Sequence, residues 1–363
     1  MPMSRDKSLP SARPVSKAVL FFVAITLLNL PATAQRFQIT NLVSDISNVG
    51  TQPTDPDLVN PWGIAASGGS PWWVSDNETG KSTLYNGTGV KQKLVVNVPQ
   101  WDGTPGGNPD GIVFNNTTDS FQLTPGNPAV FLFATEDGTI QGWNPNVNLT
   151  NTVIEVNGFP NAVYKGLTLG AVSGKNYIYA ANFRAGTVDV FNTSFKSHSF
   201  GSSAFVDSTI PAGFAPFNVA TINGNILVAY AKQDSQKHDD VAGPGNGYLR
   251  VFNSQGKLLQ RLPHVFQLNS PWAMVVAPGG WGSFSGKLLV GQFGSGAIAA
   301  FDLASNSFKG TLRDTSGLPL RINGLWGLGF GNGSGSGPTT TLYFAAGYFD
   351  EAHGLFGTIA PAP

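Results

Sequence analysis

The side chains that could do chemistry in this sequence are mostly carboxylates and amides in short polar turns. Asp76 and Asn77 lie in one such turn, Glu136 in a second and Asp350 in a third. Oxygen-rich groups of this kind suit Ca²⁺ or Mg²⁺ if the fold brings them together. Tight turns also favour Asp and Asn for reasons of backbone conformation, so a purely structural role for each of these residues stays open.

The chain lacks the residues or motifs that several other kinds of active site require. There is no cysteine, which removes thiol catalysis and thiolate metal sites. The G-x-S-x-G, H-E-x-x-H, G-x-G-x-x-G and P-loop motifs are absent, and the four histidines are far apart. One of them, His238, precedes Asp239 and Asp240 in the longest polar insertion, residues 231–248. That insertion is either a lid or a solvated loop, and we expect its histidine and acids to be solvated.

A short phrase repeats along the chain near these turns. It occurs as PWGIAAS (61–67), PDGIVFN (109–115), YKGLTLG (164–170), PFNVATI (216–222), PWAMVVA (271–277) and LWGLGFG (325–331). The third position of each copy is small or turn-prone: Gly63, Gly111, Gly166, Asn218, Ala273 and Gly327. A second apolar run, a polar turn and further short strands follow each copy. Units of roughly fifty residues that recur in this way indicate a repeat architecture.

Six such units, each with four short antiparallel strands, predict an all-β fold, the six-bladed β-propeller. Only 36 residues follow Gly327, enough for three strands, while residues 36–46 form a strand without a unit of its own. We therefore predict that this N-terminal strand completes the last blade and closes the ring. The first strand of each blade would line a central channel, where a large side chain at the small position would crowd the axis.

This fold would bring the polar and aromatic side chains of several blades together at one mouth of the channel. The residues just before the small position, here called the mouth positions, are Trp62, Asp110, Lys165, Phe217, Trp272 and Trp326. The turns between second and third strands share their face, and functional residues usually lie on loops held by a rigid frame. The predicted ligand-binding residues are Trp62, Asp76, Asn77, Lys165, Arg184, Trp272 and Trp326. The tryptophans could stack on a flat ligand, although we favour the alternative that they pack between blades.

The composition limits the kinds of partner that this chain can have, and the N-terminal residues indicate its compartment. Charged residues are 12% of the chain and the formal net charge is zero, so neither nucleic acid nor an anionic membrane is an expected partner. A basic start, the apolar run 18–30 and the small residues Ala32 and Ala34 form the pattern of a cleaved export signal. We predict a signal peptide over residues 1–34, one propeller domain over residues 35–363, and a secreted protein, periplasmic or extracellular. An uncleaved N-terminal anchor is the alternative.

The phrases NPWGIA (60–65), WVSDN (73–77), NPDGIVFN (108–115) and SPWAMVVAP (270–278) resemble those of a family of uncharacterised secreted bacterial β-propellers. That family is similar in style to NHL-repeat and gluconolactonase-like propellers. The resemblance runs from about Arg36 to Pro361 and implies fold and export, but no established activity. Some relatives carry a C-terminal sorting anchor, whereas this chain ends TIAPAP, and we expect it to be released.

Gluconolactonase-like propellers hold one divalent ion at the channel mouth with a Glu, two Asn-type ligands and an Asp. By position, the resemblance implies Asp110, Glu136, Asn182 and Asn218 as the metal ligands of this chain, with Ca²⁺ as the ion.

Two functions remain at this point. The first, which we favour, is a monomeric ligand-binding or interaction module whose channel mouth takes a small molecule, a glycan or a protein. The second is a divalent-metal-dependent hydrolase of gluconolactonase-like type, supported if Asp76, Asp110 and Glu136 converge on one face. Whether the chain is an enzyme stays open between them.

Overall fold

Strands make up nearly all the regular structure of the computed structural model, which describes residues 35–362. The one helical element in this range is a single 3-10 turn, Gly282–Phe284, so no helix there is long and apolar enough to cross a membrane. Abundant glycine and proline with few charged residues favour this outcome, because they supply many tight turns between short strands. The predicted signal peptide, residues 1–34, lies outside the described residues.

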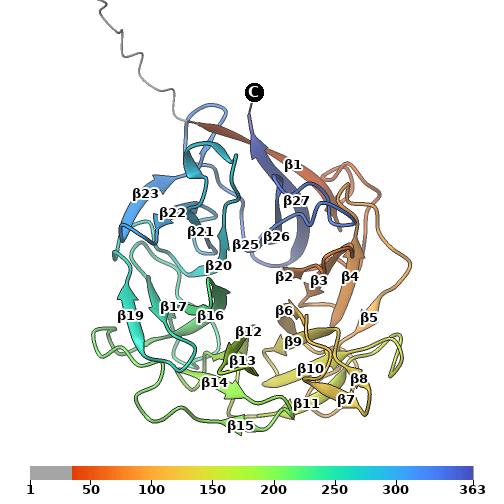
Figure 1. Ribbon diagram of the computed structural model, residues 1–363. Helices are drawn as coiled ribbons and strands as arrows, with labels where there is room; N and C mark the ends of the chain where they lie inside the picture. The colour runs from red at the N-terminus through yellow and green to blue at the C-terminus, as the bar shows by residue number, and fades with distance from the viewer. Residues whose placement is uncertain (1–34, 363) are drawn as a thin grey trace, which may run out of the picture. The chain divides into compact units, whose positions relative to one another are not determined.

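All but two of the strands form six sheets arranged around a central channel (Figure 1). From the channel outward, blade 1 contains β2 (Pro61–Ala65), β3 (Trp72–Asp76), β4 (Lys81–Tyr85) and β5 (Val96–Asn97). Blade 2 contains β6 (Pro109–Phe114), β9 (Phe131–Thr135), β10 (Thr139–Trp143) and β11 (Val153–Asn157), with a small hairpin of β7 (Gln122–Thr124) and β8 (Asn127–Pro128) beside it. Blade 3 contains β12 (Tyr164–Val172), β13 (Lys175–Asn182), β14 (Thr187–Phe191) and β15 (Ser197–His198).

The second half of the ring repeats this order. Blade 4 contains β16 (Phe214–Ile222), β17 (Asn225–Lys232), β18 (Gly247–Phe252) and β19 (Leu258–Arg261). Blade 5 contains β20 (Pro271–Val276), β21 (Leu288–Gln292), β22 (Ile298–Asp302) and β23 (Ser307–Thr311). Blade 6 contains β25 (Leu325–Phe330), β26 (Leu342–Tyr348), β27 (His353–Pro361), β1 (Arg36–Ser44) and the short β24 (Arg313–Asp314). The predicted six-bladed β-propeller is confirmed.

The N-terminal strand closes the ring as predicted. β1 pairs antiparallel with β27 along nearly its whole length, from Phe37 opposite Pro361 to Ser44 opposite Leu355. On its other side β1 makes a short parallel pairing with β24, which is the edge strand of the blade. Phe37 is buried and its ring lies 4.8 Å from that of Trp281, so the closing strand is held by core packing as well as by hydrogen bonds.

The third position of the repeated phrase carries a small residue because the first strands of neighbouring blades come close together there. A Cβ on Gly63 would lie 2.5 Å from the Asp110 carbonyl oxygen, and one on Gly327 would lie 2.5 Å from the Trp62 carbonyl oxygen. In blade 4 the position carries Asn218, whose side chain fills the space beside Gly166. The crowding predicted at the axis is therefore confirmed.

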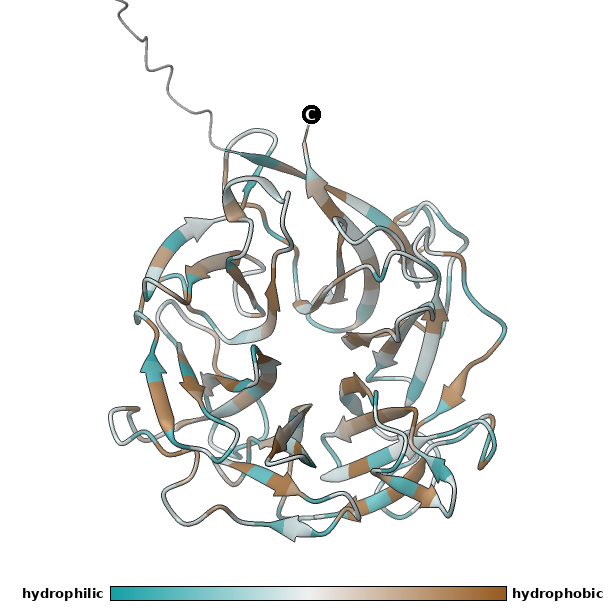
Figure 2. Cartoon of the chain, viewed as in Figure 1, coloured by the Kyte–Doolittle hydropathy of each residue, from teal (hydrophilic) through white to brown (hydrophobic). Residues whose placement is uncertain are grey.

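Apolar side chains pack between neighbouring blades, and the hydrophobic residues concentrate on the strands while most peripheral loops are polar (Figure 2). The topology also places two sets of loops on one face of the ring. These are the segments that lead into the first strands and the turns between the second and third strands. The polar network of the next subsection lies on that face.

Candidate functional site

The mouth positions close the channel instead of lining an open rim. The Trp62 and Trp326 rings stack with centroids 3.4 Å apart, and Trp272 stands nearly perpendicular to Trp62 at 5.8 Å. Phe217 completes the layer at 6.4 Å from Trp62, and none of these four side chains is more than 5% exposed. Beyond this aromatic layer the channel is a cavity of about 200 Å³ whose lining includes Gly63 and Asn218.

This layer favours the packing role over the stacking role predicted for Trp62, Trp272 and Trp326. Trp62 and Trp326 cover each other's faces, and Trp272 packs nearly perpendicular to both and is buried, so a flat ligand has no exposed indole surface to lie on in this structure. Two of the three indole nitrogens are engaged within the mouth: the Trp272 Nε1 donates to the Lys165 carbonyl at 2.9 Å, and the Trp326 Nε1 donates to Glu351 at 3.2 Å. The Trp62 Nε1 is buried without a hydrogen-bond partner among the described residues. The tryptophans form the floor of the mouth.

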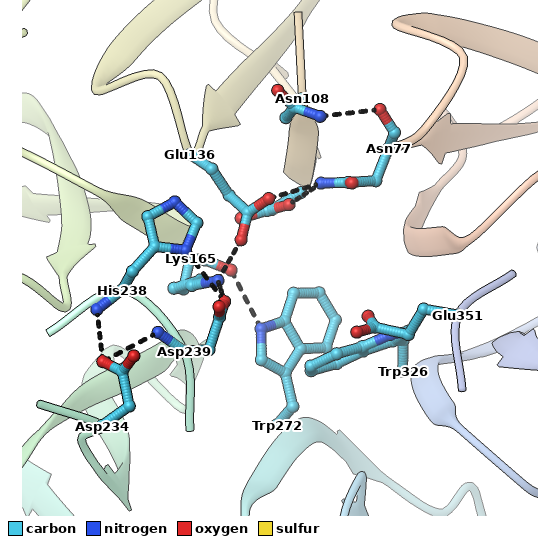
Figure 3. A network of polar contacts seen from close by, with 11 residues as sticks. Asn77, Asn108, Glu136, Lys165, Asp234, His238, Asp239, Trp272, Trp326 and Glu351 are labelled. Atoms are coloured by element: carbon cyan, nitrogen blue, oxygen red, sulfur yellow. Dashed lines mark hydrogen bonds and ion pairs between the residues drawn. The ribbon is translucent and has the colours of Figure 1, made fainter. Parts of the chain in front are cut away.

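Carboxylates and an amide lie directly above this floor (Figure 3). The Asn77 amide nitrogen donates to Asp110 at 2.7 Å and to Glu136 at 3.0 Å. It can do so because the β3–β4 turn of blade 1 lies against the start of β6 and the β9–β10 turn in blade 2. Asp110 is fully buried, and its second oxygen, Oδ2, has no hydrogen-bond partner.

Lys165 supplies the positive charge at the centre of the network. Its side chain is 1% exposed, and its ammonium pairs with Glu136 and donates to Asp239 at 3.2 Å. The same nitrogen lies 4.9 Å from the centre of the Trp62 ring. A buried amine needs such partners, because an unpaired charge away from water is very costly.

The long insertion of blade 4, between β17 and β18, reaches across to this lysine (Figure 3). Asp239 accepts from Lys165 and lies 2.9 Å from the His238 Nδ1. Asp234 caps the loop by accepting from the backbone nitrogens of His238 and Asp239. The expectation that His238, Asp239 and Asp240 are merely solvated is therefore corrected. Asp239 remains largely exposed, but it and His238 belong to the polar network, and the Asp240 Oδ2 is buried.

Glu351 enters the mouth from blade 6, on the side of Trp326. It belongs to a turn between β26 and β27 in which Phe349, Asp350 and Glu351 all have positive φ, at 53°, 51° and 65°. Three successive non-glycine residues in this conformation are unusual, and backbone strain of this kind often accompanies function. The turn places the Glu351 carboxylate against the aromatic floor.

Burial and mutual charge shift the ionisation of these groups. Burial raises the pKa of Asp110 well above its ordinary value, and the Glu136 carboxylate adds to the shift. Burial alone would lower the pKa of Lys165, but Glu136, Asp110 and Asp239 outweigh it and raise the pKa, so the amine stays protonated. Burial raises the pKa of Glu351 to about 7. The mouth therefore holds a permanent cation beside an acid that changes charge near neutral pH.

The remaining predicted ligand-binding residues lie outside this network. Asp76 is fully buried within blade 1 and accepts from the Thr83 backbone nitrogen at 2.9 Å, so a ligand at the mouth does not reach it directly. Arg184 donates to the Pro160 carbonyl at 2.8 Å. Of the predicted set, Asn77 and Lys165 are the polar members that the fold brings together.

The four metal ligands implied by the resemblance do not form one group. Asp110 and Glu136 share the Asn77 amide, but the two asparagines are engaged elsewhere. The Asn182 oxygen accepts from the backbone nitrogens of Val163 and Ala185. Asn218 accepts from the Val219 nitrogen and donates to the Trp272 carbonyl. Both amides satisfy backbone groups of the scaffold, which is the common use of asparagine in turns.

A different set of three side chains has the geometry for a cation. Glu136, His238 and Asp239 each offer a ligand atom, and these atoms lie within 4.8 Å of one another. The sequence signal for this set was the run KHDD in the longest insertion on the mouth face. It was not decisive because the reach of a loop across the ring cannot be deduced from its composition.

Comparisons with solved structures show the fold. An α-L-arabinanase of Penicillium chrysogenum has a TM-score of 0.56 at 13% identity, over 89% of this chain and 97% of that one. The aldose sugar dehydrogenase of Escherichia coli has a TM-score of 0.52 at 12% identity, over 90% and 100%. A streptogramin B lyase has a TM-score of 0.51 at 12% identity, over 90% and 97%. At such identities the likeness concerns the fold alone.

Comparisons of sequence show the family. No family model matches the chain. The protein R648 of Acanthamoeba polyphaga mimivirus, described as uncharacterised, is 32% identical over 341 residues, which cover 89% of this chain and 80% of that protein. The mimivirus protein L690, also described as uncharacterised, is 31% identical and covered to 85%. These relatives are viral, so the bacterial origin implied by the resemblance is not supported. The chain belongs to the same family as the mimivirus proteins R648 and L690.

Proposed function

We propose that this chain is an exported β-propeller that binds a small ligand carrying an amine at the mouth of its channel. The observation that carries the proposal is the convergence of Asp110, Glu136, Asp239 and Glu351 from three blades onto a sealed aromatic floor. Glu136 and Asp239 face the Lys165 ammonium as carboxylates, and Glu351 adds a further negative charge as the pH rises through about 7, so a cation is the complementary ligand above that pH.

The ammonium of Lys165 supports the choice of an amine. It is a primary amine that already sits between two carboxylates and over an aromatic face. Cations of this type are attracted by carboxylates and by the face of an indole. The unpartnered Asp110 Oδ2 is a further acceptor buried in the same network. A ligand amine would find a carboxylate on the exposed side, where Asp239 faces water.

Calorimetric titration with glucosamine and with glucose tests this proposal, because the two sugars differ by the amine. We expect heat of binding from glucosamine alone. Asp239→Asn and Glu351→Gln should each weaken the binding, whereas Glu78→Gln, a change at an exposed acid of the neighbouring turn, should leave it unchanged. Equal binding of both sugars, or none of either, would contradict an amine-selective mouth.

The alternative function is a divalent-metal-dependent hydrolase, and the Glu136–His238–Asp239 group favours it. Two carboxylates and an imidazole fit Mn²⁺ or Zn²⁺ better than the all-oxygen shell that Ca²⁺ prefers. The Lys165 ammonium already pairs with two of the three residues, so an ion would have to displace it. Thermal unfolding with Mn²⁺, Zn²⁺ and Ca²⁺ tests this alternative: stabilisation that is lost in Glu136→Gln supports it, and no shift with any ion argues against it.

Export and a monomeric state are part of the same proposal. Within residues 1–34 a basic start is followed by the apolar run 18–30 and then by the small residues Ala32 and Ala34, and this order supports a cleaved signal. N-terminal sequencing of protein recovered outside the cytoplasm should begin at Gln35. Size-exclusion chromatography with light scattering should give one chain per particle.

A further inference from the structure

Gln35, the first described residue, has its side chain fixed before the closing strand begins. Its Oε1 accepts two hydrogen bonds from Ser283, one from the backbone nitrogen at 2.8 Å and one from the hydroxyl at 3.2 Å. A backbone N–H can only donate, so the atom that faces Ser283 is the amide oxygen and not the amide nitrogen. Ser283 belongs to blade 5, between β20 and β21, whereas Gln35 precedes the strand that closes blade 6.

The turn around Ser283 leaves room for this side chain. Gly282 has a φ of 65°, and a Cβ at this position would overlap the Oε1 and Cδ atoms of Gln35. Gly286 in the same turn also has a positive φ, but no atom lies within 4 Å of a Cβ there. The missing side chain of Gly282 therefore forms a seat for the Gln35 amide, whereas that of Gly286 serves the backbone alone.

The backbone next to Gln35 is held as well. The carbonyl of Arg36, the following residue, accepts from the Ala362 nitrogen at 2.9 Å, and Arg36 pairs with Arg313 in β24. Gln35 is thus fixed on its carbonyl side by the sheet and at its side-chain oxygen by Ser283. Holding both parts of one residue in this way reduces the entropy that a reaction between them has to overcome.

The surroundings of Gln35 matter because the export signal proposed above ends directly before it. Cleavage after Ala34 would make the α-amine of Gln35 the first group of the chain, and such an amine has an ordinary pKa of about 8. Lys309 and Arg313 line the same surface pocket as Gln35, which has a volume of about 360 Å³, and nearby positive charge disfavours protonation of an amine. The neighbouring Asp314 is bonded within its own turn. A large share of the α-amine is therefore neutral and nucleophilic at mildly alkaline pH.

We propose that the mature chain modifies its own first residue: the α-amine of Gln35 attacks the Cδ of its side chain and closes a pyroglutamate ring. The new bond joins the α-nitrogen to Cδ, the bond from Cδ to Nε2 breaks, and ammonia leaves with the proton that the α-nitrogen gives up. The negative charge that develops on Oε1 is met by the two donors of Ser283, as an oxyanion is in acyl transfer. This inference rests on the proposed export. The lactam carries no terminal charge and offers no free amine to an aminopeptidase, so it protects the strand that closes the ring.

Mature protein released from a fusion by a protease that cuts directly before Gln35 tests the proposal. Its intact mass, followed over time at about pH 8, should show the loss of one ammonia. We expect a rate about tenfold above that of a synthetic peptide of residues 35–43, a modest gain because Ser283 is exposed to water. Gly282→Ala should lower the rate to that of the peptide, and Ser283→Ala should lower it in part, since the backbone donor remains. Gly286→Ala is the matched control and should cyclise as the wild type does.

The outcomes separate this reaction from the amine site and from the export signal. A folded protein that cyclises no faster than the peptide, or a Gly282→Ala variant as fast as the wild type, would overturn the proposal. Ser283→Ala changes an exposed residue and should unfold at the wild-type temperature, so slower cyclisation in it reports the lost donor. Titration with glucosamine does not involve Gln35, and either result can fail while the other holds. For protein exported by its own N-terminus, a mass that begins at Gln35 with its ammonia retained would contradict the modification, and a mass that begins elsewhere would contradict the cleavage on which it rests.

Discussion

The ammonium of Lys165 lies 4.9 Å from the centre of the Trp62 ring. The two residues occupy equivalent mouth positions in blades 3 and 1, so the repeat itself brings a cation over an aromatic face at the channel axis. Attraction of this kind is worth about 2 kcal/mol when the cation is desolvated. The aromatic floor and the polar network above it are therefore one unit, and changing either should disturb the other.

Lys165→Met should lower the free energy of unfolding by about 3–5 kcal/mol, because it leaves Glu136 and Asp110 without their buried cation. Urea unfolding at neutral pH measures the loss. The double variant Lys165→Met with Glu136→Gln should recover part of it, since the second change removes the unpaired charge. A single variant as stable as the wild type would show that the lysine is not needed to compensate the acids.

Gly63→Ala should destabilise the ring by about 1–3 kcal/mol, because the new methyl would lie 2.5 Å from the Asp110 carbonyl oxygen and overpack the axis. Gly68→Ala is the matched control in the same blade. No atom lies within 4 Å of a Cβ at that position, so its stability should stay within about 0.5 kcal/mol of the wild type. Equal effects of the two changes in chemical unfolding would contradict close packing at the axis.

Glu351 should make the stability depend on pH between its ordinary pKa of 4.5 and its folded pKa of about 7. In that interval the folded protein retains a proton that the unfolded chain has lost. Its contribution to stability is therefore complete below pH 4.5 and is lost as the pH rises through 7. Glu351→Gln, which stays neutral, should gain stability relative to the wild type as the pH rises.

Unfolding measured across a pH series checks this, with Glu78→Gln as the control at an exposed position. Asp110 and Asp76 also have raised pKa values caused first by burial, so the wild type alone would not isolate Glu351. The comparison between wild type and Glu351→Gln does. Parallel curves for these two proteins would mean that Glu351 ionises alike in the folded and unfolded states.

Phe37→Ala should lower the free energy of unfolding by about 3–5 kcal/mol, because it creates a cavity where the closing strand packs on Trp281. Thr40→Ala changes an exposed residue of the same strand and should cost less than about 1 kcal/mol. If both variants unfolded at the same urea concentration, the N-terminal strand would contribute pairing but no core.

Much of the fold was predictable from the sequence for a physical reason. A propeller blade cannot bury its sheet faces alone, so each must repeat the apolar pattern that covers its neighbour. The PWGIAAS-like phrases are the copies of that pattern. Each contains a small residue because the backbones of neighbouring blades come close together at the axis. The lone strand near Phe37 had one place left to pair, which is why ring closure could be predicted as well.

The site was only partly predictable, because a repeat indicates which face a residue occupies and not what it touches there. Asn77, Asp110, Glu136 and Lys165 share the mouth because their register positions require it. That the tryptophans would seal the channel depends on side-chain size and orientation across the axis. Asp239 reaches Lys165 across 74 residues of chain through a loop whose path no local pattern specifies.

The amino-acid sequence by itself thus determined six repeated units, their closure and the face that carries the polar groups, since all of these follow from local periodicity. Tertiary structure alone decided which of those groups meet and which tryptophans are covered. Such contacts depend on the convergence of distant blades and loops, and convergence is a property of the closed ring.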